Sequence, residues 1–498
     1  MNPHRQRKSG RRLVAAILLL LALIAIGWSL DLGPFRQMRA YRDGVRAYVY
    51  GFPLLLMDAT NGAMSAAPGS DPRYCQINQI SHSKRFLNAQ FRDVVRPNVD
   101  TLYSSAWLDL SAEPLVLHLP DTHGRYHLLP LLDAWTNVFA APGSRTTGDK
   151  GGDFAIIGPN FSGTLPAGLT RLDSPTATAW MIGRVLASGS EDYAAVDALQ
   201  REMTLTPLSR WHGSGNRVVE SECIPQARSG KGPTPLAQVL GLDAQAYFAR
   251  LAQLMKNNPA PVRDAGMSAV LKGLGIVPGQ SFALSALDPR LAAGLAQAHE
   301  TGSAVMHIIA QAGTKKALQN DVGLLAGLPK MLMHRLAENK NGWSYPRKLG
   351  DYGTNYVYRA VVSVLGLGAN LDADALYPNT EVDGTGEALD GSHPYLLHFD
   401  KADLPPVAAF WSLTLYGSDN YFVDNRLDRY ALGSLSRGLR YNEDGSLDIH
   451  IQNQAPTTEE SNWLPAPPGK FILNLRLYWP LQQALDGSWR APAVQRLN

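Results

Sequence analysis

Arginine, aspartate and tyrosine side chains in widely separated segments are the residues of this chain best suited to binding or proton transfer. Arg476 lies inside a strongly apolar stretch, Phe471–Tyr478, where a guanidinium must be paired or bound to something. Arg359 follows a run of tyrosines. Asp100 and Asp133 lie among aromatic residues, so they are the candidate acid–base groups of a catalytic site.

The environment of Asp100 admits two interpretations. If the segment from Asn98 forms a strand, Tyr103 and Trp107 share one face, and Asp100 falls on the apolar face with Leu102. A carboxylate there needs partners or a raised pKa, which favours a ligand-binding or acid–base role. The alternative is an aspartate that caps a turn by accepting hydrogen bonds from nearby backbone N–H groups.

A second polar group follows the predicted strand Tyr126–Leu132. Asp133 and Asn137 lie close to Trp135 there, and small-ligand sites combine aromatic residues with a few polar groups. The pattern therefore indicates a pocket lining that includes Tyr126, Asp133 and Asn137. Alternatively, Asp133 and Asn137 only close the loop.

The spacing of Tyr352, Tyr356 and Arg359 places these side chains on one stripe if the segment is helical. Two tyrosines that lead to a guanidinium suit a carboxylate or phosphate ligand. The alternative is a structural clamp, in which Arg359 pairs with an acidic residue from a neighbouring domain.

Two aromatic-rich strands, Phe410–Tyr416 and Phe471–Tyr478, are predicted near the C-terminus. In the second, Asn474, Arg476 and Tyr478 point away from the leucines. This polar set resembles a pocket wall inside a jelly-roll-like sandwich, although a solvent-facing sheet would give the same alternation. The candidate ligand-binding residues of all these segments are Tyr103, Trp107, Tyr126, Asn137, Tyr356, Arg359, Tyr416, Trp463, Arg476 and Tyr478.

Established catalytic and metal-binding patterns are missing from the sequence. His118, His123 and His127 fall close together, and a hairpin-like connection between two predicted strands would let them converge. The ligand spacing of a strand-borne metal site is missing, as are the HExxH, GxSxG, P-loop and GxGxxG patterns. We therefore predict no metal site and leave any cofactor unknown.

The composition indicates a large globular protein without a nucleic-acid partner. The chain has 498 residues, of which 45% are hydrophobic and 18% are charged, so it is long enough for roughly two or three packed domains. The formal net charge is only +3, and several of the basic residues precede residue 13. The remaining body is close to neutral, which argues against nucleic-acid binding.

The first 31 residues predict a membrane segment. A basic start precedes an apolar run, Leu13–Leu30, that is long enough to cross a bilayer as a helix. The flanking charge predicts a single-pass inner-membrane protein with its body on the periplasmic side. We expect an uncleaved anchor, with a removed signal peptide as the alternative. Cys75 and Cys223 would then lie in an oxidising compartment, either paired or both free.

Hydrophobic periodicity predicts an α+β fold with two antiparallel β-sandwich modules joined by a mostly helical segment. A helix is expected over Phe35–Met57, short strands from Asn98 to Val185, and further helices that begin at Ser190, Asp243, Pro261 and Asp288. The expected domains are an anchor at 1–31, a first β-sandwich at 35–189, a helical segment at 190–375 and a second β-sandwich at 376–498.

Long sequence motifs carry a resemblance to a known pair of domains. RPNVDTLYSSAWLDLSAEPLVLHLPDTHGRYHLLPLLDAWTN resembles the domain of unknown function numbered 1254. FWSLTLYGSDNYFVDNRLDRY and NWLPAPPGKFILNLRLYWP resemble its usual partner, numbered 1214, with YGTNYVYRAVVSVLGLGAN between the two. The resemblance covers roughly Ala47 to the C-terminus, and it implies an architecture rather than a reaction.

Two classes of function stay open at this point. We expect a cleft where the helical segment meets the sandwiches, in which Arg359 and Arg476 together bind a small anionic or amphipathic molecule. A hydrolase or lyase that uses Asp100 or Asp133 is one interpretation. A non-catalytic ligand-binding or envelope-assembly protein is the other. The expected partners are the small molecule and the membrane, and a homo-oligomer stays open.

Overall fold

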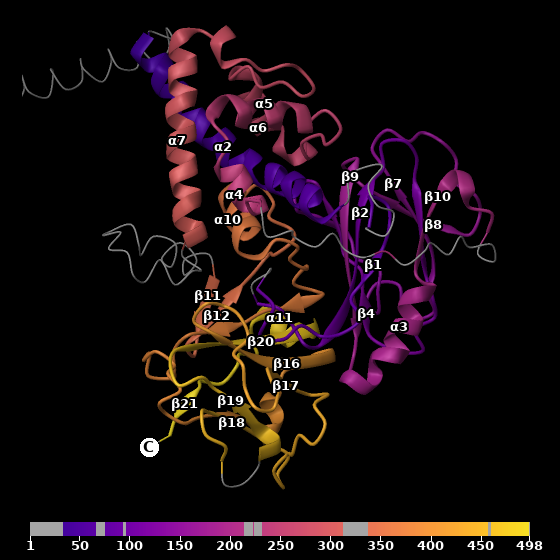
Figure 1. The fold of residues 1–498 in the computed structure, drawn as a ribbon, viewed down its shortest axis with the longest axis vertical. Coiled ribbons are helices and arrows are strands. Elements are labelled where there is room, and N and C mark those ends of the chain that lie inside the picture. The colour runs from indigo at the N-terminus through magenta and orange to yellow at the C-terminus, as the bar shows by residue number, and fades with distance from the viewer. Residues whose placement is uncertain are drawn as a thin grey trace, which may run out of the picture.

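A computed structural model describes residues 33–65, 75–92, 96–213, 223, 232–311, 337–456 and 460–497. Figure 1 shows a layer of helices above two β-rich parts, the first drawn in purple and the second in orange and yellow. The chain is therefore an α+β protein with several sheets whose strands are mostly antiparallel. The predicted membrane segment, Leu13–Leu30, lies outside the described residues. Among the residues that are described, no helix combines the length and apolar character that a membrane span requires.

The first β-rich part packs two sheets around one core. Leucines of β2 and β3 meet Phe154 and Ile156 of β7 and Met181 of β9 in that core. The pairing is antiparallel except between β7 and β8. One sheet contains β1 (Ser81–His82), β2 (Thr101–Asp109), β9 (Thr178–Leu186), β4 (His127–Leu128), β5 (Leu131–Asp133) and β6 (Val138–Ala140), and the other contains β10 (Thr204–Pro207), β3 (Leu115–Leu119), β7 (Gly152–Ile157) and β8 (Leu169–Asp173).

The second β-rich part repeats this arrangement around a core of leucines, isoleucines and aromatic rings. Strands β18 and β19 are parallel, and the other pairs are antiparallel. One sheet contains β11 (Ala337–Lys340), β12 (Trp343–Pro346), β14 (Asn379–Thr380), β13 (Ala375–Leu376), β20 (Phe471–Pro480), β16 (Val407–Gly417) and β17 (Ala431–Gly433), and the other contains β19 (Trp463–Pro465), β18 (Leu447–Gln452), β15 (Tyr395–Phe399) and β21 (Gln495–Arg496).

The helical layer is built around the long helix α2 (Gly33–Met64), which crosses α7 at close range. Gly44 of α2 allows this approach, because a Cβ there would lie 2.7 Å from the Cβ of Ala298. Gly302 of α7 faces the ring of Tyr48 in the same way. The other α-helices within the described residues are α3 (Tyr193–Glu202), α4 (Pro235–Leu240), α5 (Ala244–Leu254), α6 (Ala265–Gly273), α7 (Pro289–Gln311), α10 (Tyr356–Gly366) and α11 (Gln482–Asp486).

Several local predictions can be compared with these elements. Helix α2 contains the predicted helix Phe35–Met57, and Asp243 caps α5 by accepting a hydrogen bond from the Ala246 N–H at 2.7 Å. The predicted hairpin around His123 is wrong. Strand β3 pairs with β7 and β10, whereas β4 and β5 pair with β9, so the chain passes from one sheet to the other.

The domain boundaries stay predictions, but several helices and strands pack in a different part of the molecule from the rest of their predicted domain. Helix α2 packs in the helical layer, although nearly all of its residues fall within the range predicted for the first β-sandwich, 35–189. Strand β10 joins the first β-rich part, and β11 and β12 join the second. The segment 190–375 therefore contributes edge strands to both β-rich parts as well as helices.

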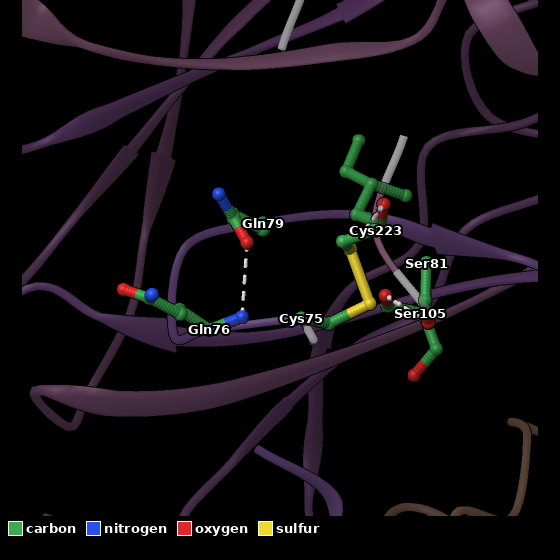
Figure 2. The surroundings of a disulfide bond; sticks show 7 residues. Cys75, Gln76, Gln79, Ser81, Ser105 and Cys223 are labelled. Carbon is green, nitrogen blue, oxygen red and sulfur yellow. Dashed lines mark hydrogen bonds between the residues drawn. A yellow bond between two sulfur atoms is a disulfide. The ribbon is translucent and has the colours of Figure 1, made fainter. Parts of the chain in front are cut away.

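A disulfide joins Cys75 to Cys223 beside the start of the first β-rich part (Figure 2). The two Cα atoms are 4.8 Å apart, and 148 residues separate the cysteines in the sequence. This bond links the segment before β1 to a segment far along the chain. The pairing that the sequence left open is thus formed.

Candidate functional site

The candidate site lies where the outer faces of two sheets meet. In β2, Leu102, Ala106 and Leu108 point into the core, so Tyr103 and Trp107 point outward. Strand β9 alternates in the same way, and its Arg184 lies directly opposite Tyr103 in the antiparallel register. The outer face of this sheet therefore presents a guanidinium next to a phenol.

The facing sheet of the second β-rich part has the same construction. In β16 and β20 the leucines fill the core, and the register places Ser412 opposite Arg476 on the outer face. Tyr478 follows on β20, opposite Phe410. The predicted alternation of β20 is confirmed, with Asn474, Arg476 and Tyr478 on the polar face.

Arg476 is held firmly although it is only 4% exposed. Its Nη1 donates to Thr414, and its Nη2 donates to Tyr416 Oη and to the carbonyl oxygen of Arg96 at 3.1 Å. Burial alone would lower the pKa of Arg476, but Tyr416, Tyr478 and Asp100 raise it, so the side chain is charged. Within the described residues it forms no ion pair.

Asp100 brings the two faces together. The Ser412 hydroxyl on β16 donates to its Oδ2 at 2.8 Å. Asp100 precedes Thr101, the first residue of β2, so the alternation of the strand does not extend to it. The predicted position of Asp100 on the apolar face is therefore corrected. Burial raises the pKa of Asp100, while Arg476 and the Ser412 hydrogen bond lower it in part. The predicted need for partners is met across the junction between the two sheets.

Arg184 is the main residue that the sequence analysis missed. It is 8% exposed, and its Nη1 donates to the Ile182 carbonyl at 2.9 Å and to Asn370 Oδ1 at 3.0 Å. Its Cζ lies 5.4 Å from the centre of the Tyr103 ring. No carboxylate of the described chain forms an ion pair with it, and neither its Nε nor its Nη2 has a hydrogen-bond partner there. An arginine between apolar strand residues was the signal that could have revealed it.

Phenol groups surround the two arginines. Tyr377 receives a hydrogen bond from Asn370 Nδ2 at 2.6 Å, and Tyr478 is 1% exposed with no hydrogen bond from its hydroxyl to any described residue. Burial raises the pKa of Tyr377 and of Tyr478, so both are neutral phenols. We call Asp100, Tyr103, Arg184, Tyr377, Arg476 and Tyr478 the junction cluster.

Two further predicted residues adjoin the junction cluster. Tyr126 packs edge-on against Phe410, with ring centres 5.4 Å apart, and against Tyr478 at 5.9 Å. Tyr416 donates its hydroxyl hydrogen to the Pro97 carbonyl and lies beside Arg476. Both rings support the walls of the cluster.

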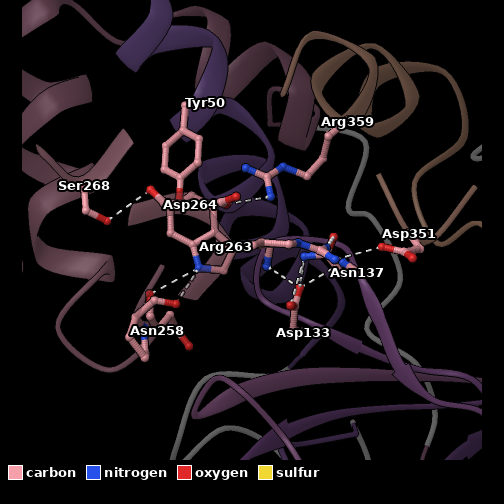
Figure 3. A network of polar contacts seen from close by, with 11 residues as sticks. Tyr50, Asp133, Asn137, Asn258, Arg263, Asp264, Ser268, Asp351 and Arg359 are labelled. Atoms are coloured by element: carbon pink, nitrogen blue, oxygen red, sulfur yellow. Dashed lines mark hydrogen bonds and ion pairs between the residues drawn. The ribbon is translucent and has the colours of Figure 1, made fainter. Parts of the chain in front are cut away.

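A second polar cluster lies between α2, α6 and α10, and Arg359 is at its centre (Figure 3). Arg359 Nη1 forms an ion pair with Asp264 Oδ2 at 3.4 Å, and the two side chains are 1% and 0% exposed. Tyr50 donates to the same oxygen at 3.1 Å. We call Tyr50, Trp135, Asp264, Tyr356 and Arg359 the clamp cluster, because these rings surround the guanidinium at 5.0 to 5.5 Å.

Asp133 and Asn137 lie next to the clamp cluster rather than in the junction cluster. Asp133 Oδ1 accepts hydrogen bonds from the backbone N–H groups of Trp135 and Asn137, each at 2.8 Å. Burial raises its pKa, and the bonds from Asn137 lower it in part. Arg263 donates to Asn137 Oδ1 at 2.8 Å. These contacts agree with the loop-closing alternative.

The expectation of one shared cleft is therefore corrected. Arg359 and Arg476 have no hydrogen-bond partner in common, and each belongs to its own cluster. Tyr352 precedes α10 and is not on the helical stripe predicted for it. Two predicted ligand-binding tryptophans contact other residues of the chain. The ring of Trp107 stacks on that of Trp180, with ring centres 4.8 Å apart, and Trp463 donates its indole N–H to the Gln452 carbonyl at 2.8 Å.

Other features of the described chain lie apart from both clusters. A surface depression of about 410 Å³ between α2, α4 and α5 is lined by apolar residues and the Asp58–Arg250 ion pair, and contains no predicted site residue. His118 Nδ1 contacts Asp153 Oδ1 at 2.7 Å, and His127 lies in the other sheet. The described residues contain no group of three or more potential metal ligands.

Comparison with family models confirms the resemblance that the sequence motifs carry. Residues 77–207 match the model described as "Protein of unknown function (DUF1254)", and residues 374–482 match "Protein of unknown function (DUF1214)". Asp100, Tyr103 and Arg184 come from the first match, and Tyr377, Arg476 and Tyr478 come from the second. Tyr50, Asp264 and Arg359 lie outside both. The junction cluster is therefore built by the two matched domains.

A solved structure shares the fold. The crystal structure of the VPA0106 protein from Vibrio parahaemolyticus matches with a TM-score of 0.64 at 21% identity, over 92% of this chain and 100% of that chain. An uncharacterized protein from Burkholderia cenocepacia matches with a TM-score of 0.41 at 12% identity, over 96% of this chain and 98% of that chain. A search of curated proteins found no match.

Proposed function

We propose that this chain, which carries both matched domains of unknown function, is an envelope protein that binds a small anionic molecule in the junction cluster. The observation that carries this proposal is the pair of buried guanidiniums, Arg184 and Arg476, that form no ion pair within the described residues. Asp100 attracts Arg476 without forming an ion pair, so Arg184 is the charge that most needs a partner. Burying a charge without an ion pair is expensive, so a partner from outside the chain is the expected compensation.

The proposed location rests on separate support. The Cys75–Cys223 disulfide suits an oxidising compartment, in agreement with the periplasmic side of an inner membrane. The anchoring helix at Leu13–Leu30 and a jelly-roll strand order stay predictions, as does the choice between an anchor and a cleaved signal peptide.

Catalysis is the second candidate, and Asp100 is the observation that favours it. Its Oδ1 has no hydrogen-bond partner in the described chain, and its pKa is raised by burial. A carboxyl group of this kind beside a neutral phenol, Tyr478, can exchange a proton with a ligand that the arginines hold. A lyase reaction fits this arrangement better than hydrolysis through a covalent nucleophile. The non-catalytic alternative needs only the binding step.

The test is a metabolite screen by native mass spectrometry on the full chain and on Arg184→Gln. We expect anionic ligands to bind the wild-type protein and to be lost in the variant. Arg429→Gln is the matched control, because Arg429 is another partly buried arginine that donates to backbone carbonyl oxygens. Equal ligand uptake by Arg184→Gln and the wild-type protein would refute the assignment. Turnover of a bound ligand that Asp100→Asn abolishes would identify an enzyme.

A further inference from the structure

The hydrogen atoms of two phenol groups in the junction cluster have fixed directions. Asn98 Oδ1 accepts from the backbone N–H groups of Asp100 and Thr101, both at 3.0 Å, so the amide cannot be flipped. Its Nδ2 therefore donates to Tyr103 Oη. Because that oxygen already accepts an N–H, the Tyr103 hydrogen is the one left to be donated.

The second phenol is fixed by the same arrangement on the other side of the cluster. Asn370 is 0% exposed, and its Oδ1 accepts from Arg184 Nη1 at 3.0 Å. A guanidinium has no acceptor, so this oxygen assignment is also unambiguous. Nδ2 then donates to Tyr377 Oη at 2.6 Å. In the described part of the chain neither tyrosine hydrogen has an acceptor.

The junction cluster consequently consists almost entirely of donors. The O–H groups of Tyr103, Tyr377 and Tyr478 and the Nε and Nη2 of Arg184 are all without acceptors among the described residues. Asp100, which lies near Arg476 and Tyr478, supplies a carboxylate oxygen, Oδ1, that accepts no hydrogen bond from the described residues. With Asp100 ionised, the members of the junction cluster carry a net charge of +1. The charged neighbours Arg96 and Glu381, and Arg145 and Asp374, are of opposite sign in each case and add no net charge. Such a set complements an oxyanion that carries one negative charge.

We propose that the ligand is a singly charged carboxylate whose oxygens accept from Arg184, Tyr103 and Tyr377, and that Asn98 and Asn370 are the positioning residues that make both phenols donors. This inference rests on the proposed function and narrows it to a class of ligand. It also assigns a role to residues without charge, which a search for ionisable groups alone would pass over.

The test uses benzoate, its neutral isostere benzamide and inorganic phosphate as probes, with the full chain in isothermal titration calorimetry. Benzoate is expected to bind the wild-type protein more tightly than benzamide or phosphate. Tyr377→Phe removes one donor and should weaken benzoate about 10-fold while leaving benzamide unchanged, since a hydrogen bond to a charged group is worth roughly 1.5–3 kcal/mol. Asn370→Asp should weaken benzoate further, because the new carboxylate accepts the Tyr377 hydrogen and pairs with Arg184.

Tyr395→Phe is the matched control, because its phenol oxygen also accepts an N–H, from Asp390 at 3.1 Å, but lies in β15 away from the cluster. Its benzoate affinity should equal that of the wild-type protein. Wild-type affinity in Tyr377→Phe, or equal binding of benzoate and benzamide, would overturn the inference. So would tighter binding of phosphate, or no binding of benzoate at all. These results leave the Arg184→Gln screen to decide the proposed function separately.

Discussion

The clamp cluster and the junction cluster both bury arginine, but they differ in what neutralises it. In the clamp cluster, Asp264 forms an ion pair with Arg359 and three aromatic rings enclose the guanidinium. In the junction cluster, the described chain provides Arg184 with carbonyl, amide and phenol neighbours but no carboxylate ion pair. Burial of an arginine therefore does not by itself identify a binding site. The lack of a directly paired carboxylate is the more useful signal: Asp374 lies near enough to attract Arg184, but its ion pair is with Arg145.

The two clusters also differ in how accessible their phenols are. Tyr50 is fully buried and its hydroxyl is bound to Asp264, whereas Tyr103 and Tyr377 keep part of their surface exposed. The Arg359–Asp264 ion pair suits a structural role, because removing one partner leaves an uncompensated charge. Arg359 Nε and Nη2 and Asp264 Oδ1 are nevertheless buried without hydrogen-bond partners among the described residues, so the two clusters differ in ion pairing rather than in complete hydrogen bonding. An unpaired cluster with accessible donors suits a ligand.

The largest expected effect is on the clamp cluster. Asp264→Ala leaves Arg359 buried without its carboxylate, and breaking a buried pair in this way costs about 3–5 kcal/mol. We expect a marked fall in the urea midpoint, measured by circular dichroism. A variant as stable as the wild-type protein would show that Arg359 has another partner.

Reduction of the disulfide should have the next largest effect. Closing a long loop stabilises a folded chain by about 2–4 kcal/mol, so Cys75→Ala together with Cys223→Ala should lower stability by that order. The bond lies beside β1 and β2, so the loss should weaken binding at the junction cluster through Tyr103. Unchanged thermal unfolding of the double variant would contradict this expectation.

Removing the unpaired charge should affect stability least. Arg184→Met keeps the length of the side chain, and replacing an uncompensated buried charge by an apolar group is neutral or slightly stabilising, within about 1 kcal/mol. The same variant should lose the anionic ligand. A destabilisation as large as that of Asp264→Ala would place Arg184 in the same structural class as Arg359.

A smaller effect is expected on the pH dependence of ligand binding at the junction cluster, which contains Asp100. Burial raises the pKa of Asp100 above its value in the unfolded chain. Its contribution to stability is therefore fully present below the unfolded pKa, about 3.9, and is lost as pH rises through the folded pKa. The affinity for an anionic ligand should also fall as pH rises, because ionised Asp100 repels the ligand. Calorimetric titrations at several pH values should show weaker binding as pH rises, and Asp100→Asn should remove that slope.

Local pattern in the sequence predicted much of what each strand and helix does. Arg476 and Tyr478 were assigned to the polar face of β20, and Asp243 to a helix cap, because both follow from the spacing of neighbouring residues. The structural clamp at Arg359 was one of two stated alternatives. Its partner, Asp264, is distant in sequence and could not be named from spacing.

What the sequence could not provide is the pairing of faces from different sheets. Arg184 occurs in an apolar strand, and only the register with Tyr103 and the contact with Asn370 show its position. Asp100 was placed by alternation, which fails because β2 begins one residue later. The two arginines chosen for one cleft lie in different clusters for the same reason, since periodicity carries no information about which surfaces meet.

Helix α2 has a mechanical consequence for everything that precedes it in the chain. Its 32 residues run without interruption through Pro53, and at 1.5 Å of rise per residue they amount to about 48 Å. Its middle contacts Arg359 through Tyr50, Met57 nearer its C-terminal end packs against Trp107 and Trp180 of the first β-rich part, and its other end reaches the tip of the molecule in Figure 1. The chain before Gly33 is therefore joined directly to a long helix rather than to a flexible linker.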